Sequence, residues 1–246
     1  MSRDRMRESW DERARKDAFY YVETAQWDGD VEAFYALGEE RARMLIDPVL
    51  GRLPRPAGAC DALDLGCGVG RFSRALAARF KTVLGVDVSE EMVRQAGEQH
   101  PQEAFPNLRF EAGDGVSVPA VDGSSDFVFS YEVFQHMPSE DVIQANLREV
   151  SRVLRRDGAA LLHVKTEAER GTAARLVPDA LVRLAKRAVG RDPLVSDPSF
   201  RGTAVSRDRL EGLFNEAGLS VRELREDPTH EPGSRVFVLA SPRSSR

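Results

Sequence analysis

The first fifty residues carry apolar side chains at helical spacing. Met6 and Trp10 lie four positions apart, and apolar residues return every three or four positions over residues 31–50. Such a period places apolar side chains on one face of a helix. A linker rich in Pro and Gly, residues 51–58, then interrupts the pattern. We therefore expect residues 3–50 to be helical.

From residue 60 onward, short apolar runs alternate with helical patterns. The runs that predict strands are residues 60–65, 82–86, 107–112, 127–130, 159–164, 219–224 and 235–240. The helical patterns are residues 70–80, a stretch capped by Ser89, and residues 139–154 and 206–217. This alternation predicts an α/β fold with a Rossmann-like, doubly wound, mostly parallel seven-stranded sheet. Because no helical pattern separates the last two runs, we expect an antiparallel last strand.

The pattern also predicts how the chain is organised. Residues 1–58 are expected to form an N-terminal helical cover and a linker, and residues 59–246 the Rossmann-like core. The segment 167–205 is longer than a simple crossover loop, which indicates a substrate-side insertion. Apolar positions over residues 176–188 form one helical face there. That face could cover an apolar small molecule, form a dimer contact, or pack on the core as a plain surface helix.

Composition excludes several classes of protein. The 246 residues hold 35 Lys and Arg against 40 Asp and Glu, a net charge of -5, whereas nucleic-acid-binding domains usually carry a basic excess. The chain has no apolar run near the roughly 18 residues of a membrane helix and no secretory signal. Cys60 and Cys67 are too few for a disulfide framework and lack the neighbours of a zinc site. We expect a cytoplasmic monomer or homodimer that binds no metal, nucleic acid or membrane.

The segment DLGCGVGR, Asp64 to Arg71, follows one predicted strand and opens a helix. Gly66 and Gly68 allow a tight turn and a close approach of ligand to backbone. Glycine also occurs in tight turns without a ligand, so this motif alone is a weak signal. Arg71 stands where a dinucleotide-binding turn needs a small residue, which disfavours NAD. Asp64 would repel a pyrophosphate but suits a ligand with an ammonium group.

Two further carboxylates follow neighbouring strands. Asp87, in VDVS, ends the second strand and can accept hydrogen bonds from both ribose hydroxyls. Asp114, between two glycines, follows the third strand and can accept an adenine amino group. Each has an alternative: Asp87 can simply precede the helix that Ser89 caps, and Asp114 can simply form a turn. Arg71, for its part, is expected as a surface or helix-start residue.

Together these motifs, with SYEVFQHM after the fourth strand, resemble the class I S-adenosylmethionine-dependent methyltransferases, of the small-molecule and quinone-biosynthesis kind. The resemblance covers roughly residues 60–165 by motif. It implies S-adenosylmethionine as cofactor and transfer of its methyl group to an O, N or C nucleophile of a metabolite, as in secondary metabolism. The cofactor-binding residues that it implies are Asp64, Gly66, Cys67, Gly68, Asp87, Val88, Met92, Gly113, Asp114, Gly115, Ser130, Tyr131 and Tyr21.

A general base matters only when the acceptor must lose a proton. His136 follows the fourth strand, at the edge of the sheet where doubly wound folds bind ligands, and is the expected catalytic residue. It can instead pack near the cofactor without a catalytic role. His163 lies within a strand and is expected to be structural, whereas His100 and His230 are expected in solvated loops.

The acceptor is left open by the sequence. SYEV differs from the Asn/Asp-Pro-Pro-aromatic pattern of enzymes that methylate planar amino nitrogens, so nucleic-acid bases are not expected as substrates. The main hypothesis is an enzyme that methylates a small molecule. A non-catalytic S-adenosylmethionine-binding or regulatory module and an NAD-type oxidoreductase are the alternatives.

Overall fold

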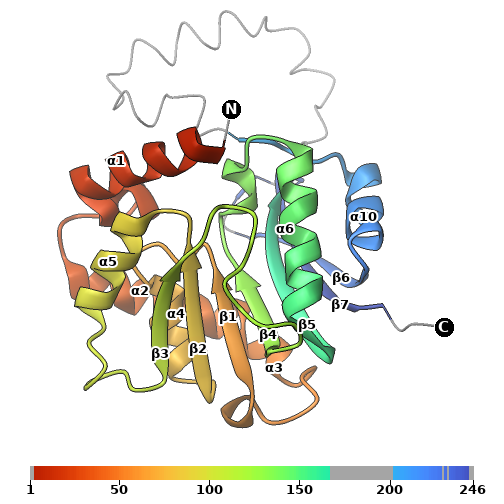
Figure 1. Ribbon diagram of the computed structural model, residues 1–246, viewed down its shortest axis with the longest axis horizontal. Helices are drawn as coiled ribbons and strands as arrows, with labels where there is room; N and C mark the ends of the chain where they lie inside the picture. Colours follow the sequence, from red (N-terminus) through yellow and green to blue (C-terminus); the bar gives the residue numbers. More distant parts are fainter. Residues whose placement is uncertain (1–2, 167–201, 229, 232, 244–246) are drawn as a thin grey trace, which may run out of the picture.

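The computed structural model describes residues 3–166, 202–228, 230–231 and 233–243. Its centre is one seven-stranded sheet in the order β3-β2-β1-β4-β5-β7-β6 (Figure 1). The strands are β1 Asp61–Leu65, β2 Thr82–Asp87, β3 Leu108–Ala112, β4 Ser125–Ser130, β5 Leu154–Lys165, β6 Leu219–Glu226 and β7 Arg235–Pro242. β7 runs antiparallel to both of its neighbours, whereas the pairs from β3 to β5 are parallel. The Rossmann-like, mostly parallel sheet predicted from the sequence is confirmed.

Helices cover both faces of this sheet. The helices are α1 Arg3–Val22, α2 Val31–Leu45, α3 Asp47–Leu50, α4 Arg71–Ala77, α5 Glu90–Gln99, α6 Glu140–Val153 and α10 Arg207–Glu216. α6 and α10 pack with Leu63 and Val128 in one apolar cluster. α2, α3 and α4 pack with Ala62 and Phe127 in another. Since side chains alternate along a strand, adjacent residues of β1 and of β4 enter opposite layers of the core.

The helix starts follow local capping chemistry. Ser89 accepts a hydrogen bond from the backbone N–H of Met92 at 3.1 Å and caps α5, as expected. Ser139 caps α6 in the same way, through the N–H of Val142. β5 is longer than expected because it begins at Leu154, directly after α6, where Leu154 pairs with Ser125 of β4.

The N-terminal helices lie outside the strand–helix alternation. α1 crosses one end of the sheet (Figure 1), and its backbone departs from helical geometry at Asp17 (φ −169°, ψ 91°). The Asp17 carboxylate accepts hydrogen bonds from the backbone N–H of Tyr20 at 2.9 Å and from the Trp27 indole at 3.0 Å. It thereby caps the second half of α1 and ties it to the connection that leads to α2.

The predicted insertion over residues 167–205 lies almost entirely outside the described residues, and so does the apolar face over residues 176–188. At its end, Val205 forms a parallel bridge with Thr166. Among the helices that the structure describes, none is long and apolar enough to cross a membrane.

Candidate active site

A cavity of about 580 Å³ lies at the carboxyl ends of the central parallel strands, beneath α1. It is lined by the turns after β1, β2, β3 and β4, and by Met6 and Trp10 of α1. Ligands bind at this edge in doubly wound folds because crossover connections leave a crevice there. Of the predicted cofactor-binding residues, the lining includes Asp64, Gly66, Cys67, Gly68, Asp87, Val88, Met92, Gly113, Gly115, Tyr131 and Tyr21. The predicted base His136 lines the same cavity.

The glycine turn after β1 has the conformation that its sequence predicts. Gly66 and Gly68 have φ of 79° and 52°, in the left-handed region that favours glycine. A Cβ on Gly66 would lie 2.1 Å from a methyl group of Val133. The turn therefore needs glycine at this position, both for its φ and for its close approach to the chain after β4.

Asp64 is a buried carboxylate at the end of β1, 3% exposed, on the cavity wall. Its Oδ2 accepts a hydrogen bond of 2.6 Å from the Ser73 hydroxyl. Burial raises the pKa of Asp64 to about 7, although this hydrogen bond opposes the shift. A cation bound in the cavity would offset this cost, as expected of a residue that faces an ammonium group.

Asp87 ends β2 and holds two neighbouring turns together. Its Oδ2 accepts from the backbone N–H of Gly68 at 2.9 Å and its Oδ1 from that of Ser89 at 2.9 Å. Burial raises the pKa of this carboxyl group. Asp87 thus lines the cavity and holds the glycine turn in place. It does more than precede the helix that Ser89 caps, because it also binds the backbone of Gly68.

Asp114 and Ser130 lie outside the cavity lining. The Oδ1 atom of Asp114 accepts from the backbone N–H groups of Val116 and Ser117, so this exposed residue forms a turn. The buried Ser130 hydroxyl donates to the carbonyl oxygen of Leu65 at 2.8 Å and joins β4 to β1. Binding roles for these two residues remain predictions.

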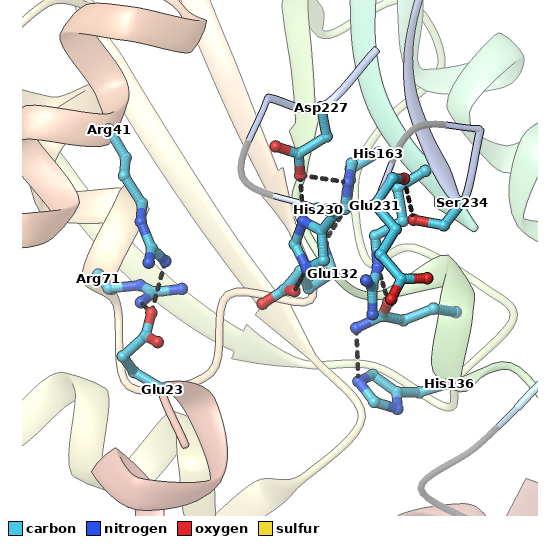
Figure 2. A network of polar contacts seen from close by, with 12 residues as sticks. Glu23, Arg41, Arg71, Glu132, His136, His163, Asp227, His230, Glu231 and Ser234 are labelled. Atoms are coloured by element: carbon cyan, nitrogen blue, oxygen red, sulfur yellow. Dashed lines mark hydrogen bonds and ion pairs between the residues drawn. The ribbon is translucent and has the colours of Figure 1, made fainter. Parts of the chain in front are cut away.

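Next to the glycine turn, the cavity wall is strongly charged. Glu23 forms ion pairs with Arg41, at 2.5 Å, and with Arg71 (Figure 2). Arg71 begins α4, as expected, but the expectation of a surface position is wrong, since it is 3% exposed. Its guanidinium lies over the rings of Phe34 and Phe72, 5.3 and 5.2 Å from their centroids. Cation–π contact and a carboxylate together make its burial tolerable.

His136 lies in a short 3-10 turn, Phe134–His136, after β4. Its ring meets Trp10 of α1 edge to face at 5.2 Å. Its Nε2 atom lies 3.2 Å from the amide nitrogen of Gln135, whose carbonyl oxygen accepts a hydrogen bond of 2.7 Å from Nε of Arg235. His136 therefore faces the cavity within a polar chain that reaches β7.

The expectations for the other histidines need two corrections. His100 is 2% exposed, because its Nδ1 atom lies 2.8 Å from the carbonyl oxygen of Ala96 and its ring packs between Tyr35 and Phe105. His230 is half-buried and lines the cavity, 2.7 Å from Asp227, so it is not a solvated loop residue.

The expectation that His163 is structural agrees with its burial, at 1% exposed. Its ring stacks on Tyr131 with centroids 4.8 Å apart.

Several lining residues had no signal in the sequence. Tertiary packing brings together Glu23, which follows α1, Arg41 of α2 and Arg71 of α4. Glu132 and His230 come from the connections that follow β4 and β6. The sequence held one hint of a role for His230, which lies between acidic residues in EDPTHE.

The known proteins that resemble this chain in sequence and in structure include several named methyltransferases. Residues 63–162 match the methyltransferase domain family. Trans-aconitate 2-methyltransferase of Deinococcus radiodurans is 42% identical over 91 residues, 36% of this chain and 33% of that protein. The 27-O-demethylrifamycin SV methyltransferase of Amycolatopsis mediterranei is 33% identical over 126 residues, 50% of this chain and 45% of that protein. The chain thus spans between a third and a half of these relatives' length.

Among solved structures, magnesium protoporphyrin IX methyltransferase from Synechocystis, with bound SAH (S-adenosylhomocysteine), aligns with a TM-score of 0.63. The alignment covers 99% of this chain and all of that chain at 20% identity. At this identity the likeness establishes the fold.

Proposed function

We propose that the chain, whose residues 63–162 match the methyltransferase domain family, is a class I S-adenosylmethionine-dependent methyltransferase that moves a methyl group from S-adenosylmethionine to a nucleophilic atom of a small molecule. This proposal rests on one observation. The glycine turn, Asp64 and Asp87 line the same cavity as a group of charged and aromatic side chains.

The residues of the cavity fit the methyl donor. Gly66 packs against Val133, which leaves no room for a Cβ, and the same glycine lines the cavity. The buried Asp64 carboxylate suits the ammonium group of the methionine portion, and Asp87 suits the ribose hydroxyls. Val88 and Met92 offer apolar surface to the adenine from the start of α5.

S-adenosylmethionine supplies an activated methyl group when bound, so the protein must chiefly position the acceptor and exclude water. Trp10 and Met6 of α1 line the cavity. We propose that residues 1–58 act as a cover over the core that begins at residue 59.

The lining points to a polar acceptor of modest size. Arg41, Arg71 and Arg235 face the cavity together with Glu23 and Glu132. Such a wall binds a molecule with hydrogen-bonding or charged groups more readily than an aliphatic one. The two relatives described above are named for trans-aconitate and a demethylrifamycin, a carboxylate and a hydroxyl acceptor by name, and these two classes head the list of candidates.

A hydroxyl acceptor needs a base, and the sequence singled out His136 for this role. Its place on the cavity wall beside Trp10 is compatible with contact to an acceptor. A carboxylate acceptor needs no base, because it arrives ionised.

Isothermal titration calorimetry with S-adenosylhomocysteine, S-adenosylmethionine and NAD tests the donor. We expect the first two to bind and NAD not to bind. Asp87→Ala should weaken S-adenosylhomocysteine binding at least about tenfold, since each hydrogen bond to a charged group contributes roughly 1.5–3 kcal/mol. Asp157→Ala, at an exposed position near the start of β5, is the matched control and should bind normally.

Turnover against phenols, alcohols, amines and carboxylates then separates an enzyme from a regulatory module. Donor binding without turnover of any acceptor class would favour the regulatory alternative. Binding of NAD in place of S-adenosylhomocysteine would contradict the proposal.

A further inference from the structure

Beside the cavity, His163 of β5 meets Asp227 and His230 from the loop after β6. Asp227, 3% exposed, lies just after β6. Its Oδ2 atom is 2.7 Å from Nδ1 of His230 and 3.0 Å from Nε2 of His163 (Figure 2). The carboxylate therefore contacts both imidazole rings, of which His230 lines the cavity.

A backbone N–H group determines which ring nitrogen of His163 carries the proton when the ring is neutral. The N–H of Glu132 donates to Nδ1 of His163 at 3.3 Å, so a neutral His163 carries its proton on Nε2. Burial lowers the pKa of His163, which keeps the ring neutral. With a proton on Nε2, His163 holds an N–H group 3.0 Å from Oδ2 of Asp227, in an orientation that does not form a hydrogen bond in this structure.

The same proton bears on whether a metal ion could bind here. The three side chains lie close enough together to surround one. A metal would need Nε2 of His163 deprotonated and its Nδ1 protonated, against the Glu132 N–H. The donor set therefore fits a proton network better than a metal centre.

In a neutral His230 the proton lies on the other ring nitrogen, Nδ1. Its Nδ1 atom faces the Asp227 carboxylate, which can only accept, so Nδ1 carries a proton. Its Nε2 atom lies 3.4 Å from Oε1 of Glu132, and both residues line the cavity. In the neutral ring, Nε2 is thus the atom that can accept a proton from a bound molecule. An imidazole oriented by a buried carboxylate is the arrangement of a general base.

Glu132 itself has an unusual backbone. Among the residues that the structure describes, it is the one non-glycine with a positive φ, 59°. This conformation is strained for a residue with a Cβ. Strained residues of this kind cluster at functional sites. Here the strain accompanies a carboxylate placed beside His230.

The other imidazole of the cavity is less available. Arg235 donates to the Gln135 carbonyl oxygen, which fixes the orientation of that amide. The amide N–H₂ of Gln135 then points at Nε2 of His136, 3.2 Å away, and occupies its lone pair. His136 can accept a proton at Nε2 only if Gln135 moves.

We propose that His230, oriented by Asp227, is the general base of this site and that the acceptor is a hydroxyl compound. The inference rests on the proposed methyltransferase function. The hydroxyl proton passes to Nε2 of His230, and an oxygen lone pair forms the bond to the methyl carbon. The electron pair of the broken carbon–sulfur bond stays on sulfur, giving the neutral thioether. Positive charge thus moves from sulfur to the imidazolium, where Asp227 and Glu132 stabilise it.

Charged and titratable groups surround His230 from four segments: Asp227 from its own loop, Glu132 after β4, His163 of β5 and Arg235 of β7. The hydrogen bond with Glu132 raises the pKa of His230 above 6.5, while burial and Arg235 oppose this shift. Below that pKa the ring is protonated and cannot act as a base. Activity should therefore fall on the acidic side at a pH above 6.5.

The first test is nitrogen-15 NMR of the four histidines of the full chain, with His230→Gln assigning the signal. We expect His230 to be an Nδ1–H tautomer when neutral and to titrate above pH 6.5. Glu132→Gln should shift this titration to lower pH. A neutral His230 protonated at Nε2, or a titration below pH 6.5, would overturn the proposal without any need for an acceptor.

The second test is kinetic, with whichever phenol or alcohol of the acceptor panel turns over. His230→Gln should lower kcat by about 10²–10⁴-fold and abolish the acidic limb of the pH profile. Asp227→Asn should lower kcat with little change in KM, and Glu132→Gln should move the limb to lower pH. His136→Gln should keep the limb. S-adenosylhomocysteine affinity, measured for each variant, reports whether the fold is intact.

The proposal would be overturned by an acidic limb that survives in His230→Gln, by a limb lost in His136→Gln alone, or by turnover that EDTA abolishes and a divalent metal restores. Turnover restricted to carboxylates would do the same. If the wild-type protein binds no S-adenosylhomocysteine, the proposed function itself fails. If it binds the ligand and turns over an alcohol with an unchanged limb in His230→Gln, the role of His230 alone fails.

Discussion

At the residue scale, the cavity keeps carboxylates where burial disfavours their charge. Asp64 and Asp87 both line it, and burial raises the pKa of each. A protein that served only its own stability would place neutral side chains here. The cost is offset when a cation binds beside Asp64, so its carboxyl group links stability, pH and donor affinity.

We predict that Asp64→Asn stabilises the ligand-free protein at pH 8. The pKa of Asp64 rises from 3.8 to about 7 on folding, so the folded state favours the protonated form. Its contribution to stability is greatest below pH 4 and is lost as the pH rises to 7. The variant should therefore gain on the order of 1–3 kcal/mol at pH 8, a gain that shrinks toward pH 4. Urea unfolding at both pH values measures this.

The same variant should bind S-adenosylhomocysteine more weakly, because the ammonium group loses its carboxylate partner. A variant that is no more stable at pH 8, or that binds the ligand as well as wild type, would contradict this role of Asp64.

At the scale of elements, polar contacts to α5 and apolar packing of Ala14 and Ala18 hold α1 against the core. Oδ1 of Asp11 accepts hydrogen bonds from the Ser89 hydroxyl at 2.6 Å and from the Glu91 N–H at 3.2 Å. These bonds join the middle of α1 to the first turn of α5, next to Met92 of the cavity wall. A helix held in this way can open locally without unfolding the sheet.

Asp11→Ala should loosen α1. Two hydrogen bonds contribute about 1 kcal/mol each, so hydrogen exchange over residues 3–22 should accelerate by roughly tenfold or more. Adding S-adenosylhomocysteine to the wild-type protein should slow exchange in the same segment if α1 covers the ligand.

Asp4→Ala is the matched control on the same helix, because the Asp4 side chain is 82% exposed and its ion pair with Arg7 contributes little. Exchange that is equally slow with and without ligand would argue against a mobile cover.

At the scale of the whole molecule, the wall of the cavity is built from many elements that meet at one edge of the sheet. α1, α2, α4 and the turns after four strands all contribute to its wall. A ligand that contacts so many elements stabilises the native state as a whole, because it binds the folded chain and not the unfolded one.

S-adenosylhomocysteine at 100 times its Kd should therefore add about 2.7 kcal/mol of stability. For a chain of this length this corresponds to a rise in Tm of about 5–10 °C. NAD at the same concentration should leave the Tm unchanged, and Asp87→Ala should show a smaller rise. Equal shifts with both ligands would contradict a site selective for the methyl donor.

The sequence by itself determined the order and type of the elements. Strand runs, helix periods and the caps at Ser89 and Ser139 are local, so they follow from neighbouring residues alone. The positions of the glycine turn, Asp64 and Asp87 could also be predicted from the sequence, because each lies within a few residues of the end of a predicted strand.

Only the tertiary structure decided the charged part of the cavity wall and the cluster of His163, Asp227 and His230 beside it. Glu23 pairs with Arg71, 48 positions away, and His163 meets Asp227, 64 positions away. His100 and Arg71 are buried partly by Tyr35 and Phe34 of α2, which lie far from them in the sequence. His230 became a candidate base only because β6 and β7 return its loop to the end of β4 and β5. Side-chain ionisation depends on burial and on charges in space, and neither of these is a local property of the chain.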